Sequence, residues 1–200
     1  MENNISGVIL AGGANKRFKG RIKAKMPVDG RSIISRITDT IGKIFREIII
    51  VTNTPEEFRE FGNYLIVSDH FKQAGPLGGI HAALKASSGE ACFVFAGDMP
   101  LLDEALIISQ IEYYRSHSCD VLIPRVDKFI EPLHALYSNI ILKDLEEYLS
   151  GRNDYAVREF FKKINVTYQQ LSNSERIVKA FTNINLPSDI IAVEKMLNAS

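Results

Sequence analysis

Apolar residues along this 200-residue chain fall into two alternating kinds of segment. Short unbroken apolar runs are typical of strands that are buried on both faces of a parallel sheet, and they predict strands at residues 7–10, 47–52, 64–67 and 91–96. Between them, apolar residues recur three and four positions apart, which predicts helices at residues 33–43, 80–86 and 102–117. A short helix is expected to open at Pro55, with Thr54 as its N-cap.

The second half of the chain continues the alternation. It predicts strands at residues 120–124, 133–137 and 181–184, and helices at residues 142–150, 157–164 and 188–197, the last with Ser188 as its N-cap. Strands that alternate with helices through short connections are typical of an α/β fold. We therefore expect a doubly wound, mostly parallel sheet with helices on both faces, in three layers.

Composition restricts the class of protein further. Hydrophobic residues make up 46% and charged residues 24% of the chain, which is ordinary for a globular domain, and the length suits one domain over residues 1–200. The 24 basic and 24 acidic residues cancel, which disfavours a nucleic-acid partner bound by bulk charge. No apolar stretch approaches the ~18 residues of a membrane span, and no signal-peptide pattern opens the chain. We therefore expect a cytoplasmic protein with a small substrate and no membrane partner.

The strongest chemical signal follows the first predicted strand. There Leu10-Ala11-Gly12-Gly13 leads into a stretch that is rich in lysine and arginine. Glycines let backbone N–H groups approach phosphate oxygens, and cations neutralise charge that develops as a phosphate bond breaks. A plain strand-to-helix turn would explain the glycine pair but not the clustered cations. The spacing is neither G-x-G-x-x-G nor that of a P-loop, which disfavours a nicotinamide dinucleotide enzyme and a P-loop NTPase.

Polar residues follow other predicted strands as well. Asn53, Asp69 and Asp98 each lie just after one, and ligands on such sheets bind at the carboxyl ends of the strands. Asp98 suits Mg²⁺, which uses few protein carboxylates together with substrate phosphates, although a helix cap or an Asx-turn would also explain it. The glycine-rich segment at residues 75–79 is either a hinge or a backbone platform for a flat base or ribose. The two cysteines lack the spacing of a zinc site.

These segments together resemble those of the molybdenum cofactor guanylyltransferases, within the nucleotidyltransferases of the glycosyltransferase-A-like, Rossmann-like fold. The resemblance rests on Leu10–Gly13 with Arg17 and Lys23, on the G-P-L-G-G of residues 75–79, and on the D-M-P-L-L of residues 98–102. It covers nearly the whole chain, because residues 132–137 resemble the pterin-side strand of the family and residues 183–189 its closing N-x-N-T-P-x-D segment.

The resemblance implies transfer of GMP from GTP to the terminal phosphate of molybdopterin, with release of pyrophosphate and with Mg²⁺ as cofactor. It implies a nucleotide-binding half at residues 1–115 and an acceptor, pterin-side half at residues 116–200 within one domain. The implied partners are GTP, molybdopterin or Mo-molybdopterin, and a molybdoenzyme or cofactor-delivery protein.

Site residues carry over by position. The resemblance implies nucleotide contacts from a set of residues at the expected sheet edge: Leu10, Ala11, Gly12, Gly13, Lys23, Asn53, Asp69, Gly78 and Asp98. It implies that Asp98 also holds the metal and that Lys23, Arg17 and Asp98 are catalytic. Lys23 fits the family spacing after Arg17, and Lys25 is its rival. Asn183, Asn185 and Arg152 are further candidates for contacts with the substrates.

Three alternatives stay open at this point. A sister enzyme could use CTP on the same pterin, or a relative could make sugar nucleotides, because base preference depends on the pocket shape around residues 10–13 and 69–79. A non-catalytic protein that keeps the fold as a nucleotide-binding scaffold would lack the metal carboxylate or the cations, and this chain has both.

Overall fold

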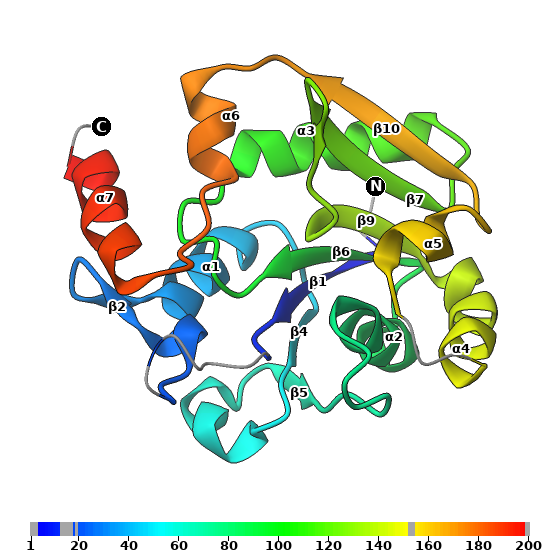
Figure 1. The fold of residues 1–200 in the computed structure, drawn as a ribbon, viewed down its shortest axis with the longest axis horizontal. Coiled ribbons are helices and arrows are strands. Elements are labelled where there is room, and N and C mark those ends of the chain that lie inside the picture. The colour runs from blue at the N-terminus through cyan, green and yellow to red at the C-terminus, as the bar shows by residue number, and fades with distance from the viewer. Residues whose placement is uncertain (1–3, 13–17, 19, 152–154, 199–200) are drawn as a thin grey trace.

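The structure is a computed structural model that describes residues 4–12, 18, 20–151 and 155–198. It has three layers, with a mostly parallel sheet between two layers of helices (Figure 1). The described residues place eight strands in this sheet, in the order β10-β7-β9-β6-β1-β4-β5 with β8 paired to β7. The expected doubly wound α/β fold is thereby confirmed.

The strands follow the apolar runs of the sequence. Their bounds are β1 Ile5–Leu10, β4 Ile48–Val51, β5 Leu65–Val67, β6 Ala91–Ala96, β7 Val121–Val126, β8 Phe129–Ile130, β9 His134–Ser138 and β10 Val166–Leu171. A separate hairpin pairs β2, Pro27–Val28, with β3, Arg31–Ser32.

The helices cover both faces of the sheet. They are α1 Ile33–Ile41, α2 Pro76–Ala86, α3 Glu104–Ser116, α4 Leu142–Ser150, α5 Val157–Phe161, α6 Glu175–Ala180 and α7 Pro187–Asn198. Helices of the 3-10 type add to them at η2 Lys23–Lys25, η3 Pro55–Phe61 and η4 Asn139–Ile141. In the part of the chain that the structure describes, no helix is long and apolar enough to cross a membrane.

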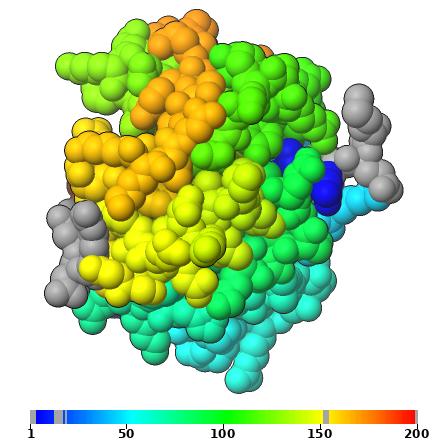
Figure 2. All heavy atoms as spheres, turned by 90° about the vertical axis from the view of Figure 1, so that its right-hand side faces the viewer, coloured from blue at the N-terminus to red at the C-terminus, as the bar shows by residue number. Residues whose placement is uncertain are grey.

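Two apolar layers sandwich the sheet. On one face, side chains of α1, α3 and α7 pack against β1, β4 and β6, and on the other face α2, α4 and α5 pack against the same sheet. Figure 2 shows the end of the molecule where α4 and α5, in yellow, lie between the residues around α2 and those of β10. Every residue of β6 is buried, which explains why its sequence is one unbroken apolar run.

Strand direction determines where a ligand can bind. β1 is paired in parallel with both β4 and β6, with Leu10 level with Val51 on one side and Ala96 on the other. Within the main sheet, β8 and β9 run antiparallel to the strands they pair with. The carboxyl ends of β1, β4 and β6 therefore lie side by side at one edge.

Some local predictions were wrong. Residues 181–184 form a connection rather than a strand, in which Ile184 is buried and its N–H donates to the carbonyl of Asp98 at 2.9 Å. β10 and α6 were not predicted, because β10 carries Thr and two Gln among its six residues and α6 is very short. The helix expected over residues 157–164 ends at Phe161, and α2 begins four residues before residue 80.

The two expected N-caps also differ. Thr54 precedes η3 but makes no capping hydrogen bond through its side chain. Ser188 lies inside α7, which begins at Pro187. The carboxylate of Asp189 instead accepts backbone N–H groups at the start of this helix.

Candidate active site

A cavity of about 660 Å³ lies at the carboxyl ends of β1, β4 and β6. It brings together residues that the sequence analysis singled out in separate parts of the chain. The lining includes Leu10, Ala11, Gly12, Lys23, Asn53, Asp69 and Asp98, together with Gly79 and with Leu133 just before β9. Gly13, Arg17 and Arg152 lie outside the described residues.

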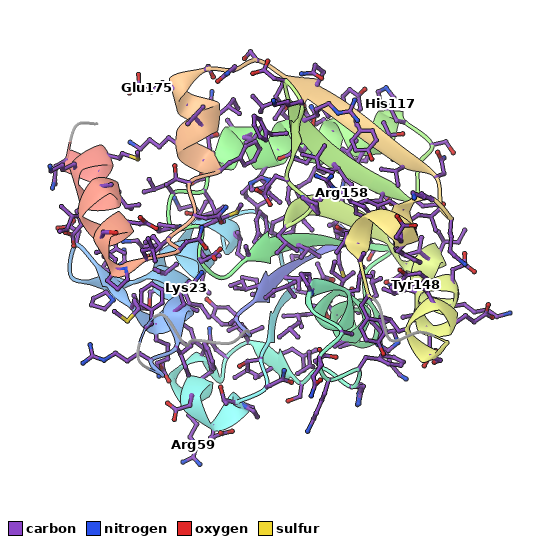
Figure 3. All side chains as sticks on the ribbon, in the orientation of Figure 1. Lys23, Arg59, His117, Tyr148, Arg158 and Glu175 are labelled. Atoms are coloured by element: carbon purple, nitrogen blue, oxygen red, sulfur yellow. The ribbon has the colours of Figure 1, made fainter. Side chains whose placement is uncertain are left out.

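The central contact of the cavity is an ion pair between Lys23 and Asp98. The Nζ atom of Lys23 lies 2.7 Å from Oδ2 of Asp98, and the two side chains are 25% and 22% exposed. Lys23 is in η2, after the loop that follows β1, whereas Asp98 comes two residues after the end of β6 (Figure 3 labels Lys23). Since both groups are largely shielded from water, their attraction is screened less than that of a surface pair.

Lys25 points elsewhere. Its ammonium donates to the backbone carbonyl of Glu57 and lies 2.8 Å from Oε1 of Glu60, on the side of η3. This contact holds the pKa of Glu60 below its usual value. Lys25 lines a neighbouring cavity of about 570 Å³. Ala11, Gly12 and Asn53 line both this cavity and the main one. The structure therefore places Lys23, and not Lys25, beside Asp98.

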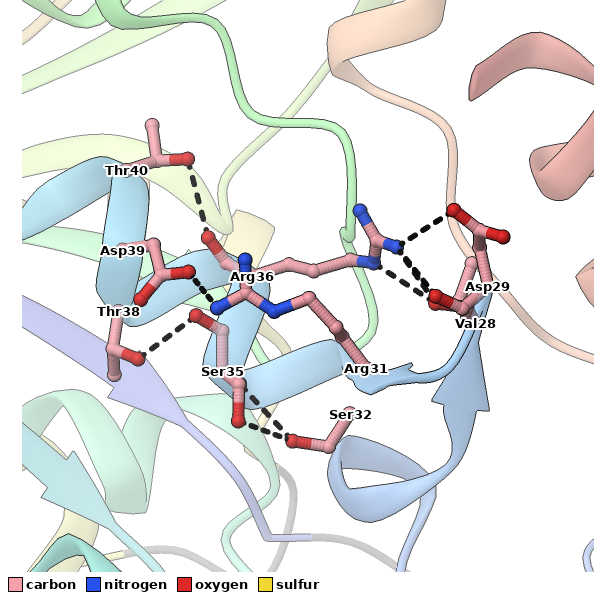
Figure 4. Close-up of polar contacts among 9 residues, drawn as sticks. All are labelled: Val28, Asp29, Arg31, Ser32, Ser35, Arg36, Thr38, Asp39 and Thr40. Atoms are coloured by element: carbon pink, nitrogen blue, oxygen red, sulfur yellow. Dashed lines mark hydrogen bonds and ion pairs between the residues drawn. The ribbon is translucent and has the colours of Figure 1, made fainter. Parts of the chain in front are cut away.

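The β2–β3 hairpin, which follows η2 along the chain, is fastened to α1 by polar contacts (Figure 4). Arg36 of α1 donates two hydrogen bonds, at 3.0 and 2.8 Å, to the carbonyl of Val28 in the β2–β3 hairpin. Ser32 caps α1 by accepting the N–H of Ser35, and Arg31 pairs with Asp39. The hairpin that follows Lys23 is thus held by the first two turns of α1.

Asp69 lines the cavity and carries a carboxylate oxygen without a hydrogen-bond partner in the described part of the chain. Its Oδ1 is buried and has no hydrogen-bond partner within the described residues. Burial raises the pKa of this carboxyl above its ordinary value. A buried acceptor without a partner costs free energy, which a ligand with an N–H or O–H donor would recover.

Glycines make the close approaches around the cavity possible. A Cβ on Gly78 would lie 2.6 Å from Oδ1 of Asp69, and a Cβ on Gly97 would lie 2.7 Å from the carbonyl oxygen of Leu10. Gly75 precedes α2 with φ of +60°, a conformation that favours glycine. The glycine-rich segment is therefore a packed platform at the start of α2.

The C-terminal segment also reaches the site. Asn185 accepts a hydrogen bond from the Nζ of Lys23 at 3.3 Å through its Oδ1, while Asn183 donates to the carbonyl of Phe181.

Sequence reasoning missed Glu131, which lies between β8 and β9. Burial raises its pKa, the charge of Asp98 adds to this effect, and Leu133 donates its N–H to the carboxyl.

The carboxylate of Asp98 is suited to bind a hard divalent cation. Among the described residues, no group of three or more His, Cys, Asp and Glu side chains could hold a metal alone. Mg²⁺ needs only one or two protein carboxylates, because substrate phosphates and water complete its shell. Asp98 would provide one such oxygen ligand, and its contact with the ammonium of Lys23 shows that the position attracts positive charge.

The fold and this site together define an α/β nucleotidyltransferase. The family described as "MobA-like NTP transferase domain" matches residues 7–170, and this chain belongs to that family.

Relatives match over almost their full length. A protein of Natranaerobius thermophilus named "Probable molybdenum cofactor guanylyltransferase" is 34% identical, with 98% of each chain covered. A "Molybdenum cofactor guanylyltransferase" of Desulfosudis oleivorans is 33% identical over 98% of this chain and 96% of the relative. The solved structure of "Molybdopterin-guanine dinucleotide biosynthesis protein A" from Archaeoglobus fulgidus shares the fold, with a TM-score of 0.83, 24% identity, and 98% and 100% of the two chains covered.

Proposed function

We propose that this protein transfers GMP from GTP to the terminal phosphate of molybdopterin and releases pyrophosphate. The observation that carries the proposal is the Lys23–Asp98 pair, 2.7 Å apart, in a cavity whose wall includes Ala11 and Gly12. The names of the relatives supply the acceptor and the base.

The reaction needs little from a general base. A phosphate oxygen of the acceptor, already a nucleophile, attacks the α-phosphorus of GTP, and the bond from that phosphorus to the bridging oxygen of the β-phosphate breaks. The electron pair leaves with pyrophosphate. Catalysis then depends on positioning and on stabilising charge on the phosphate oxygens. Lys23 supplies a fixed positive charge for this purpose, and Arg17 is proposed to supply a second.

Asp98 is the residue that would hold Mg²⁺. When bound, the metal would neutralise phosphate charge and orient the triphosphate. Asn185, which contacts Lys23, contributes a neutral amide oxygen to the same neighbourhood.

The nucleotide contacts are proposed from the cavity wall. Leu10, Ala11, Gly12 and Gly13 would approach the nucleotide through their backbone, and the free Oδ1 of Asp69 would accept a hydrogen bond from ribose or base. Asn53 lines both cavities and is placed to contact the same ligand.

The two halves are proposed to work as one domain. Residues 1–115 contribute most of the cavity lining, and Leu133 of the acceptor half joins it, with its carbonyl accepting the N–H of Ala96 at 2.8 Å. β9 of the acceptor half pairs with β6 along its length, which joins both halves in one sheet. A molybdoenzyme or delivery protein is the proposed recipient of the product.

A nucleotide comparison tests the proposal. Pyrophosphate release is measured with GTP, CTP or ATP, with and without Mg²⁺, in the presence of molybdopterin. We expect Mg²⁺-dependent release with GTP that requires the acceptor. Turnover of CTP in place of GTP would make the protein a cytidylyltransferase, turnover only with a sugar phosphate as acceptor would move it to sugar-nucleotide synthesis, and binding without release would indicate a scaffold.

A further inference from the structure

The segment at residues 183–189 contacts the ion pair between Lys23 and Asp98, although it lies beyond residues 7–170, which the family model matches. The N–H of Ile184 donates to the carbonyl of Asp98 at 2.9 Å. The next residue, Asn185, accepts from the Nζ of Lys23 at 3.3 Å. Both members of the ion pair are therefore touched by consecutive residues of this segment.

One carboxylate fixes the backbone of that segment. Oδ2 of Asp189 accepts the N–H groups of Asn185 and Leu186, each at 2.8 Å. Asp189 is the third residue of α7, and a carboxylate there commonly reaches back to the N–H groups that a helix start leaves unpaired. The two hydrogen bonds determine the direction in which the side chain of Asn185 leaves the backbone.

Helix α7 is fastened to the β2–β3 hairpin, which follows the 3-10 helix η2 that carries Lys23. Glu194 of α7 accepts the N–H of Asp29 in the β2–β3 hairpin at 2.9 Å, and Val193 is buried. Figure 1 shows α7 beside β2, far from the end of the molecule where α4 lies. Glu194 therefore holds the helix in place, whereas Asp189 holds the turn that reaches the ion pair.

We propose that Asp189 is a positioning residue for nucleotidyl transfer, which fixes Asn185 and through it holds the ammonium of Lys23 beside Asp98. The inference rests on the proposed function for its catalytic consequence, but the positioning itself is a property of the protein without substrate. A lysine side chain is long and flexible, so each contact that fixes its ammonium reduces the ordering that the reaction must otherwise supply. Asp98 provides one such contact and Asn185 another.

The first experiment needs no substrate. Asp189→Ala and Glu194→Ala are compared, because each removes a carboxylate of α7 that accepts backbone N–H groups. Lys23 is labelled at a limiting dose of an amine reagent, and its modification rate is read by peptide mass spectrometry. We expect faster labelling of Lys23 in Asp189→Ala and the wild-type rate in Glu194→Ala. An unchanged rate in Asp189→Ala, or an equal increase in both variants, would overturn the proposal.

The second experiment is a double-mutant cycle on kcat. We expect Asp189→Ala to lower kcat about 10-fold with little change in the KM for GTP, and to lower it less than about 2-fold when Lys23→Met is already present. Equal losses in both backgrounds would show that Asp189 does not act through Lys23. Asp189→Asn, which keeps an acceptor oxygen, should recover part of the activity, and thermal unfolding identifies any variant that fails to fold.

Failure of the two proposals can be told apart. If the wild-type protein used CTP, the guanylyl assignment would fall, and the cycle would be run with CTP. Labelling of Lys23 would still decide whether Asp189 positions it.

Discussion

The carboxylate of Asp69 occupies the space that a side chain at position 78 would need. A Cβ built on Gly78 would come within 2.6 Å of Oδ1 of Asp69, far closer than ordinary van der Waals contact. Asp69 lies two residues after the end of β5, and Gly78 lies in the first turn of α2. The absence of a side chain at position 78 of α2 therefore leaves room for the carboxylate of Asp69 at the cavity.

Gly78→Ala should weaken nucleotide binding by displacing Asp69. We expect the KM for GTP to rise about 10-fold, the loss expected when one hydrogen bond involving a charged group is no longer made. In an Asp69→Ala background the same substitution should have little further effect, because the displaced group is already absent. An equal rise in the KM for GTP in both backgrounds would mean that the added methyl group disturbs α2 itself. Steady-state kinetics and thermal unfolding of the four proteins provide the measurement.

Lys23→Met and Lys25→Met form a matched pair. Two residues apart in the same 3-10 helix, the lysines contact different carboxylates, and only Lys23 contacts Asp98. We expect Lys23→Met to lower kcat about 10²–10³-fold, as for the loss of one preorganised charge in an active site. Lys25→Met should leave kcat nearly unchanged. Rates measured at saturating GTP decide between them, and the reverse order would assign the phosphate lysine to Lys25.

Asp98→Asn should remove divalent metal binding. We expect Mn²⁺ binding, followed by electron paramagnetic resonance in the presence of GTP, to be lost together with activity, since an amide is a much weaker ligand for a hard cation. Asp103→Asn is the control: its carboxylate caps α3 and pairs with Arg176, outside the cavity lining. It should change thermal stability but not Mn²⁺ binding. Retained Mn²⁺ binding in Asp98→Asn would place the metal elsewhere.

The stability of the protein should fall in mild acid because of His134. Its imidazole is buried among Phe93, Phe95 and Phe181, and in the described part of the chain neither ring nitrogen has a hydrogen-bond partner. Burial lowers its pKa from 6.5 to about 4. Between these two values the unfolded chain binds a proton that the folded protein does not, so the free energy of unfolding falls as the pH drops from 6.5 to 4, by about 3 kcal/mol.

Urea unfolding between pH 4 and pH 7 measures this effect. His134→Phe should make the dependence on pH shallower, whereas His117→Phe, at an exposed position, serves as the control. An unchanged slope in His134→Phe would assign the acid sensitivity to other groups.

Much of the central sheet could be predicted because burial on both faces leaves a strong pattern. Ile48–Val51 and Ala91–Ala96 are unbroken apolar runs because helices cover both of their faces. The placement of Asn53, Asp69 and Asp98 in one cavity follows from the same reasoning, since parallel neighbouring strands end at one edge. β10 escaped prediction because Tyr168 and its neighbours form an outer strand with polar residues on it.

Other features depend on contacts that no local pattern shows. The family spacing favours Lys23 over Lys25, but the physical difference between the two lysines depends on how η2 lies against Asp98 and η3, which no local pattern shows. Asp189 acts through backbone N–H groups, which every residue has. Residues 181–184 have an apolar residue at each end, yet they form a connection in which the N–H of Ile184 donates to the carbonyl of Asp98.

The antiparallel position of β9 has a consequence for the order in which the protein folds. β7, β8 and β9 are consecutive along the chain, and β8 and β9 each pair with β7, so these contacts close only short loops. The pairing of β1 with β6, which brings Leu10 and Gly97 together, must close a much longer loop and is entropically slower. We therefore expect the cavity to form late in folding, so that a nucleotide bound there would stabilise the completed fold rather than its precursors.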